Sequence, residues 1–216
     1  MTAAVGVLTP VSPTSTEIRP RIDREIDDVL ASLPEPARLS ASERRGIVAR
    51  YSAVLEGNFI YWMTGALLAC GSDQAKTKIV DNLREEVRDC HPGMMRRFAA
   101  AASAFPDDCD ALAVSRRLSD VRLFIGRLSP VPTVVAMAFF EGFIQRFMPY
   151  LAELARLQGS SEMEYTDVHG VCDITHTEEL FRALDAELAL TPPLSHDAIV
   201  EGVGLLRDLI GNIVHN

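Results

Sequence analysis

Apolar residues recur at every third or fourth position through almost the whole chain, in segments that end at glycine, proline or acidic residues. This spacing gathers the apolar side chains on one face of an α-helix, where they pack against a neighbouring helix. No convincing run of alternating apolar and polar residues stands between turn signals, so strands are not expected. The sequence therefore predicts an all-α protein, a bundle of about seven to eight helices.

Glycine, proline and capping residues divide the chain into a tail and one helical domain. Residues 1–18 contain proline, serine and threonine without apolar periodicity, which predicts a disordered tail, and residues 19–216 are expected to form the domain. A first helix is predicted to begin at Pro20, and a long second helix to run from Ser40, which forms a capping box with Glu43, to Gly71. Further helices are expected at about 73–89, 92–104, 108–125, 130–157, 162–190 and 195–214.

Charge and cysteine content limit the class of partner. The formal net charge is −9 and no basic run is present, which argues against a nucleic-acid or anionic-membrane surface. The apolar stretches are shorter than the roughly 18 residues that span a bilayer, and the N-terminus lacks the features of a secretory signal. The 4 cysteines include no Cys-x-x-Cys pair, so neither a disulfide framework nor a zinc ribbon is indicated. We expect a cytoplasmic protein that acts on a small molecule.

The sharpest chemical feature is the segment that contains His169, Asp173 and His176. On a helix, steps of four and seven residues bring side chains back to within about 60° of one another, so all three point the same way. Two neutral imidazoles and a carboxylate at this spacing suit a divalent ion such as iron, manganese or zinc. The alternative is a polar helix face with ordinary surface histidines.

Glu141 lies inside an almost continuous apolar segment that runs from Val134 to Ile144. A carboxylate on a helix that is apolar nearly all round is expected to be buried, and an unpaired buried charge costs several kcal/mol or forces protonation. Glu141 therefore needs a cation, which is either a metal ion or the side chain of an arginine.

A third group contains the acidic pair Glu85 and Glu86, followed by His91. Residues five apart diverge by about 140° on an unbroken helix, so the helix must bend or end if Glu86 and His91 share a site. Pro92 disfavours helical geometry at His91 and predicts such a break. With these residues, a site of three histidines and three carboxylates can be assembled around two metal ions, and either Glu85 or Glu86 can supply the first carboxylate.

This pattern resembles that of the haem-oxygenase-like dinuclear iron oxidases, relatives of haem oxygenase and of the TenA thiaminases. In that family one helix carries a glutamate followed shortly by a histidine, a later helix carries a lone glutamate, and a third carries His-x-x-x-Asp-x-x-His. The resemblance extends from about Phe59 to Leu184. It implies a haem-oxygenase-like helical bundle that binds two Fe(II) ions through six residues: Glu86, His91, Glu141, His169, Asp173 and His176.

Two details refine this comparison. The Asp81-Asn-Leu segment aligns Glu86, and not Glu85, with the first ligand of the family, although the interval to His91 is shorter here than in a relative. Family members that are N-oxygenases add a carboxylate from the preceding long helix, and Glu56 is the candidate for that position.

The resemblance also implies a function. We expect an O2-dependent non-haem diiron oxygenase or oxidase of specialised metabolism, with N-oxygenation of a small amine or amino-acid-like substrate favoured. It would use an external electron donor and, by analogy, form a homodimer. Arg146 and Gln145, one turn beyond Glu141, are expected to orient a substrate carboxylate. The alternatives are oxidative C–C cleavage, desaturation, or a metal-free TenA-like hydrolase that uses Cys172.

Overall fold

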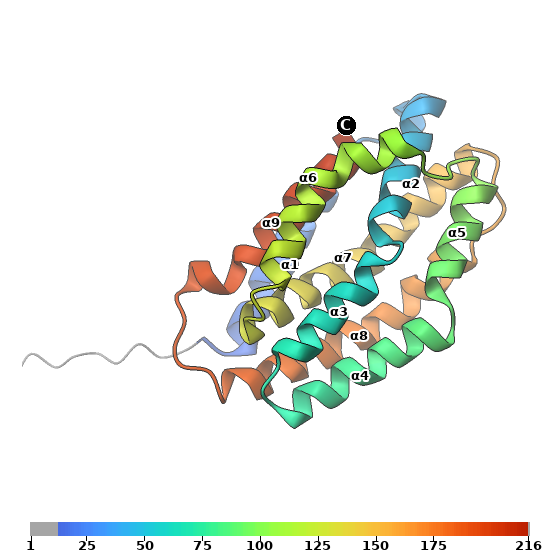
Figure 1. Cartoon of the computed structure of the whole chain (residues 1–216). Helices are drawn as coiled ribbons and strands as arrows, with labels where there is room; N and C mark the ends of the chain where they lie inside the picture. Colours follow the sequence, from blue (N-terminus) through green and yellow to red (C-terminus); the bar gives the residue numbers. More distant parts are fainter. Residues whose placement is uncertain (1–12, 216) are drawn as a thin grey trace, which may run out of the picture.

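The chain folds into a bundle of α-helices (Figure 1). The computed structural model describes residues 13–215, and within that range it contains helices and no strand, which confirms the predicted all-α class. The elements are α1 (Ser15–Ala31), the short 3₁₀ helix η1 (Pro36–Arg38), α2 (Ala41–Leu55), α3 (Asn58–Ala69), α4 (Asp73–Arg88), α5 (His91–Ala101), α6 (Asp108–Ile125), α7 (Pro130–Leu157), α8 (Glu164–Leu188) and α9 (His196–His215).

Helix α1 begins earlier than the sequence predicts, at Ser15 instead of Pro20. Thr14 is its N-cap and forms a capping box with Glu17, which satisfies amide groups at the helix start. Ile18 extends the buried stripe of this helix by one turn. The last residues of the predicted tail are therefore helical, while residues 1–12 lie outside the described range.

The single long helix predicted for residues 40–71 is two helices, α2 and α3. They meet at Glu56 and Gly57, where Gly57 adopts a left-handed conformation with φ of +79°. Glycine enters this region without the steric cost that a Cβ atom imposes, so the chain bends there. The apolar pattern continues on both sides of the bend, which explains why periodicity did not reveal it.

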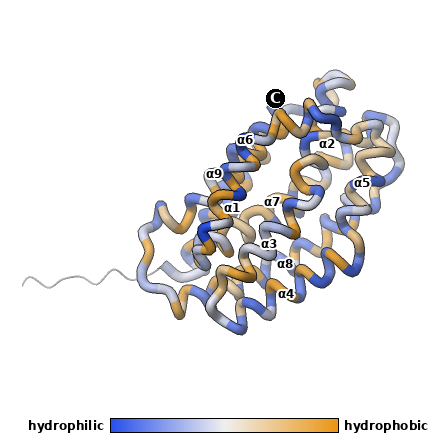
Figure 2. Tube along the Cα trace, in the orientation of Figure 1, coloured by the Kyte–Doolittle hydropathy of each residue, from blue (hydrophilic) through white to orange (hydrophobic). Residues whose placement is uncertain are grey.

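Helix α7 is the central element of the bundle. Every residue from Val131 to Ile144 is buried, and α7 contacts α1, α2, α3, α8 and α9. Outer helices are amphipathic, and hydrophilic positions recur between hydrophobic ones along α4 (Figure 2). No helix within residues 13–215 has both the length and the apolar character needed to cross a membrane.

A buried carboxylate connects α8 to the start of α4. Glu187 of α8 is 1% exposed and accepts hydrogen bonds from the backbone amides of Gly71 and Ser72, at 3.2 and 2.8 Å. Ser72 is the N-cap of α4, so Glu187 satisfies amide groups at the point where α4 begins. This contact fixes the start of α4 against α8.

The contact of α9 with α6 and α7 depends on Gly202. A Cβ atom at this position would lie 2.5 Å from the ring of Phe124 and 2.8 Å from Cβ of Ala136. We predict that Gly202→Ala lowers the free energy of unfolding by about 1–3 kcal/mol through overpacking. Gly204→Ala on the same helix is the control, because a Cβ there meets nothing within 4 Å and alanine favours the helix. Urea denaturation of both variants measures the difference, and equal stabilities would contradict this packing.

Candidate metal centre

All six residues that the sequence groups into one site meet in the interior of the bundle. They come from four helices, and each has at most 5% of its surface exposed. Helix α4 supplies Glu86, α5 supplies His91, α7 supplies Glu141, and α8 supplies His169, Asp173 and His176.

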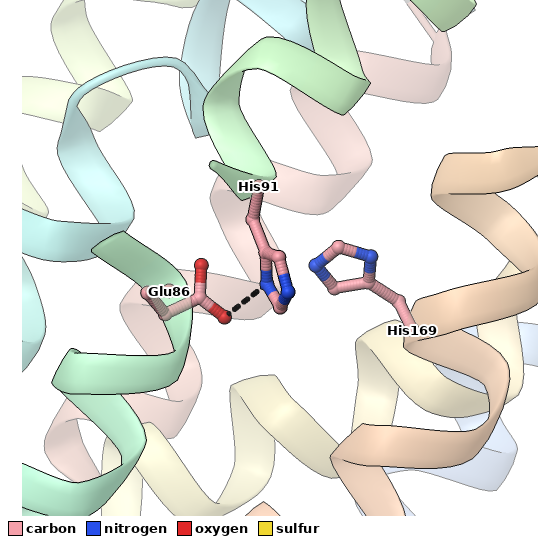
Figure 3. A group of neighbouring side chains, drawn as sticks. All are labelled: Glu86, His91 and His169. Carbon is pink, nitrogen blue, oxygen red and sulfur yellow. Dashed lines mark hydrogen bonds and ion pairs between the residues drawn. The ribbon is translucent and has the colours of Figure 1, made fainter. Parts of the chain in front are cut away.

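Glu86, His91 and His169 form the first half of this cluster, and Figure 3 shows their side chains turned toward one another. Nδ1 of His91 lies 2.8 Å from Oε1 of Glu86, and the rings of His91 and His169 are 4.5 Å apart between centroids. One potential ligand atom from each residue lies within 4.8 Å of the other two. This spacing allows all three to bind a single ion.

The break that brings Glu86 and His91 together lies between α4 and α5. Cys90 adopts a left-handed conformation with φ of +57°, and α5 begins at His91 with Pro92 in its first turn. The predicted break is therefore present, although the change of direction occurs at Cys90 and His91 itself is helical. A proline is tolerated in the first turn of a helix because its missing amide would have no partner there.

Asp173 and His176 form the second half, and Glu141 is close to both halves. Nδ1 of His176 is 3.4 Å from Oδ1 of Asp173 and 3.7 Å from Oε1 of Glu141. Glu141 also lines one small cavity together with Glu86, His91 and His169. Its carboxylate is thus next to both groups of potential ligands.

Both members of the acidic pair reach the cluster. Glu86 is buried in the first half, whereas Glu85 is partly exposed and its Oε2 accepts a hydrogen bond from Nε2 of His176 at 3.0 Å. The two acids therefore occupy different positions in the cluster. Glu86 contacts His91 in the first half, and Glu85 contacts His176 in the second half.

The cluster strongly perturbs the protonation of its members. Burial and the neighbouring Glu141 raise the pKa of Asp173 to about 7. Burial opposes a charge on His176, but contacts with Asp173, Glu141 and Glu85 outweigh it and raise the pKa of His176 to about 11. Burial and the nearby His91 lower the pKa of His169 to about 3. In the absence of a metal ion, His176 is a cation among carboxylates, and His169 is neutral.

Several details of the cluster fit a bound metal ion. Nδ1 of His169 donates a hydrogen bond to the backbone carbonyl of Tyr165 at 2.8 Å, which leaves Nε2 free to bind a metal. Oδ2 of Asp173 and Nδ1 of His176 are buried without a hydrogen-bond partner. Buried polar atoms seldom lack partners, and metal coordination would satisfy both. Imidazole and carboxylate together suit a transition metal such as iron.

The amide of Asn82 and the side chain of Tyr165 belong to this site and were missed in the sequence. Asn82 is 4% exposed, and its Nδ2 donates to Oε1 of Glu141 at 2.7 Å. The ring of Tyr165 lies 4.1 Å from the ring of His169. Asn82 lies four residues before Glu86, and Tyr165 lies four residues before His169. Residues at this spacing share one face of a helix, so the spacing could have predicted that both residues belong to the site.

Three residues that the sequence suggested do not join the cluster. Glu56 caps α2 and forms an ion pair with Arg96 of α5. Arg146 pairs with Asp27 of α1, and Nε2 of Gln145 lies 3.5 Å from the carbonyl oxygen of Gly170. These partners are distant in sequence, so local periodicity could not identify them. Binding of a substrate carboxylate by Arg146 and Gln145 therefore stays a prediction, and in this structure both side chains contact other protein groups.

Cys172, the nucleophile of the hydrolase alternative, lies in an environment that keeps its thiol protonated. Its thiol donates a hydrogen bond to Oδ1 of Asp173 at 3.1 Å. Burial and the adjacent carboxylate of Asp173 raise the pKa of this thiol far above its usual range. Since the thiolate is the reactive form, this environment disfavours nucleophilic catalysis.

Comparison with known proteins assigns the chain to a protein family. A family model described as "Iron-containing redox enzyme" matches residues 48–210, which is more than half of the chain and includes all six cluster residues. No curated protein and no solved structure matches the chain.

We predict that a divalent metal stabilises the fold through Glu141. An ion at about 100 times its dissociation constant adds about 2.7 kcal/mol of stability, which corresponds to about 5–10 °C in Tm for a domain of this size. Glu141→Gln should remove this gain, whereas Glu56→Gln, the matched control outside the cluster, should keep it. Thermal denaturation with and without Fe(II) under anaerobic conditions tests this, and an unchanged gain in Glu141→Gln would exclude the residue as a ligand.

Proposed function

The chain belongs to the iron-containing redox enzyme family, and from this premise we propose that it is an O2-dependent non-haem diiron oxygenase. One observation carries the proposal: the buried carboxylate of Glu141 is close to two groups of potential ligands. Glu141 lines one cavity with Glu86, His91 and His169, and its Oε1 lies 3.7 Å from Nδ1 of His176, which belongs to the second group. A mononuclear site needs one such group, whereas a carboxylate between two groups is the arrangement that holds a pair of ions.

This geometry supports a specific assignment of ligands. We assign Glu86, His91 and His169 to one Fe(II) ion, Asp173 and His176 to the other, and Glu141 to both. Ferrous ions bound there would supply the electrons that reduce O2. The position of Glu85 beside His176 makes it a further carboxylate at the outer side of the second ion.

The remaining residues of the site orient these ligands and limit the access of water. The carbonyl of Tyr165 fixes the orientation of the His169 ring, and Asn82 fixes one oxygen of Glu141, which leaves the other oxygen free. Apolar side chains cover the cluster, including Ile144 of α7. A dry, preorganised pocket strengthens electrostatic interactions with a reacting group.

Among the reactions open to such a site, we propose N-oxygenation of a small amine or amino-acid-like substrate in specialised metabolism. The reaction inserts one oxygen atom of O2 into a bond to nitrogen, and the second oxygen atom leaves as water. It consumes two electrons and two protons, so an external electron donor is part of the proposal. Oxidative C–C cleavage and desaturation are the alternatives. Analysis of the product distinguishes these reactions, because each of them changes a different bond.

We predict that the chain binds two iron ions and that His176→Ala binds only one with high affinity, because the second half of the cluster loses its imidazole. O2 consumption in the presence of a reductant should be abolished in this variant. His196→Ala, which removes an exposed histidine at the start of α9, is the control and should behave like the unchanged protein.

Elemental analysis after anaerobic loading measures the stoichiometry, and an oxygen electrode measures consumption. One iron ion per unchanged chain would contradict the dinuclear assignment. Equal iron content in His176→Ala and the unchanged protein would exclude His176 as a ligand.

A further inference from the structure

Cys172 lies on the same helical face as the three cluster residues of α8. From His169, steps of three, four and seven residues lead to Cys172, Asp173 and His176. Residues at these spacings share one face of a helix. The side chain of Cys172 is partly buried, and it therefore lies at the edge of the cluster, next to the second half.

The distances from the Cys172 thiol to the second half are those between ligands of one ion. Sγ of Cys172 lies 3.1 Å from Oδ1 of Asp173, and the same oxygen lies 3.4 Å from Nδ1 of His176. A divalent ion such as zinc binds sulfur at about 2.3 Å and oxygen or nitrogen at about 2.1 Å, which places neighbouring ligand atoms about 3.0–3.6 Å apart. Both distances fall in this range. One potential ligand atom from each of the three residues lies within 4.8 Å of the other two.

Two further atoms of this group have no hydrogen-bond partner. Oδ2 of Asp173 and Nδ1 of His176 are buried without a hydrogen bond, and both residues are at most 3% exposed. Nε2 of His176 contacts Oε2 of Glu85 at 3.0 Å, so Nδ1 is the nitrogen that is left for an ion. The carboxylate, the imidazole and the thiol are therefore available to the same cation.

A metal ion would change the protonation of this thiol. Without an ion, burial and the carboxylate of Asp173 raise the pKa of the Cys172 thiol, which keeps its proton. A divalent cation reverses this preference, because a thiol that coordinates a metal is deprotonated. The metal–sulfur bond forms as the S–H bond breaks, the proton leaves to solvent, and no atom changes its oxidation state.

We propose that Cys172 is a further ligand of the second metal ion, with its thiolate sulfur beside Asp173 and His176. This inference rests on the proposed function and extends it, because the proposed ligand set gives the second ion one protein ligand fewer than the first. Thiolate is a softer ligand than carboxylate or imidazole. The two metal positions therefore differ, and the second discriminates more strongly against hard ions such as magnesium and manganese.

Cobalt(II) detects a thiolate ligand directly, because a cobalt–sulfur bond absorbs strongly in the near ultraviolet and bonds to oxygen or nitrogen do not. The full chain is titrated with Co(II) alone under anaerobic conditions. We expect this absorption in the unchanged protein and in Cys109→Ser, which alters an exposed cysteine of α6. Cys172→Ser should lack it. Absorption that persists in Cys172→Ser, or that is absent from the unchanged protein, would overturn the inference.

The same titration measures how tightly the second ion is held. Cys172→Ala should bind its second Co(II) ion at least about tenfold more weakly than the unchanged protein, because even residues outside the ligand shell contribute this much to metal affinity. Cys109→Ala is the control and should bind both ions with unchanged affinity. Equal affinities in Cys172→Ala and the unchanged protein would refute the role of Cys172 as a ligand.

X-ray absorption on the unchanged chain covers the case in which the Cys172 variants do not fold. In protein loaded with Fe(II) under anaerobic conditions, we expect a sulfur neighbour of iron at about 2.3 Å, beyond the oxygen and nitrogen ligands. The iron content of the same samples separates the possible failures. Two iron ions without a sulfur neighbour refute the Cys172 ligand alone. One iron ion with a sulfur neighbour contradicts the dinuclear proposal and supports Cys172, and one without it contradicts both.

Discussion

The main constraint on this structure is that carboxylates of like charge are buried together in an apolar interior. Glu86, Glu141 and Asp173 are each at most 3% exposed, and they come from three different helices that meet at one place. Removing carboxylates from water costs several kcal/mol for each ion unless a cation compensates. The imidazoles of the cluster provide partial compensation when His176 is protonated, and metal ions would provide it fully. Three such groups within a well-packed core are therefore what an interior that binds cations requires.

The helices are arranged so that this cluster can form. α7 passes through the centre and carries Glu141 in its fully buried part, while α8 presents three cluster residues toward it along one face. The break at Cys90 turns His91 back toward Glu86, which an unbroken helix would not allow. Glu187 fixes the other end of α4 against α8. The geometry of the cluster is thus maintained by contacts at both ends of α4.

Local spacing predicted those parts of the site that depend on helical periodicity. The four- and seven-residue steps from His169 placed Asp173 and His176 on one face, and the apolar neighbours of Glu141 predicted its burial. Features that depend on distant partners were not accessible in this way. The pairing of Arg146 with Asp27 joins α7 to α1, and the contact of Glu85 with His176 joins α4 to α8. The division between α2 and α3 escaped prediction for another reason, because the apolar pattern is the same on both sides of Gly57.

The position of Glu141 between two groups of ligands is the central claim. Anomalous diffraction from crystals grown with Fe(II) under anaerobic conditions, recorded on both sides of the iron absorption edge, tests it most directly. We expect two iron peaks about 3.5–4 Å apart, with the carboxylate of Glu141 bound to both. A single peak at Glu86, His91 and His169, or two peaks that Glu141 does not contact, would contradict the dinuclear centre.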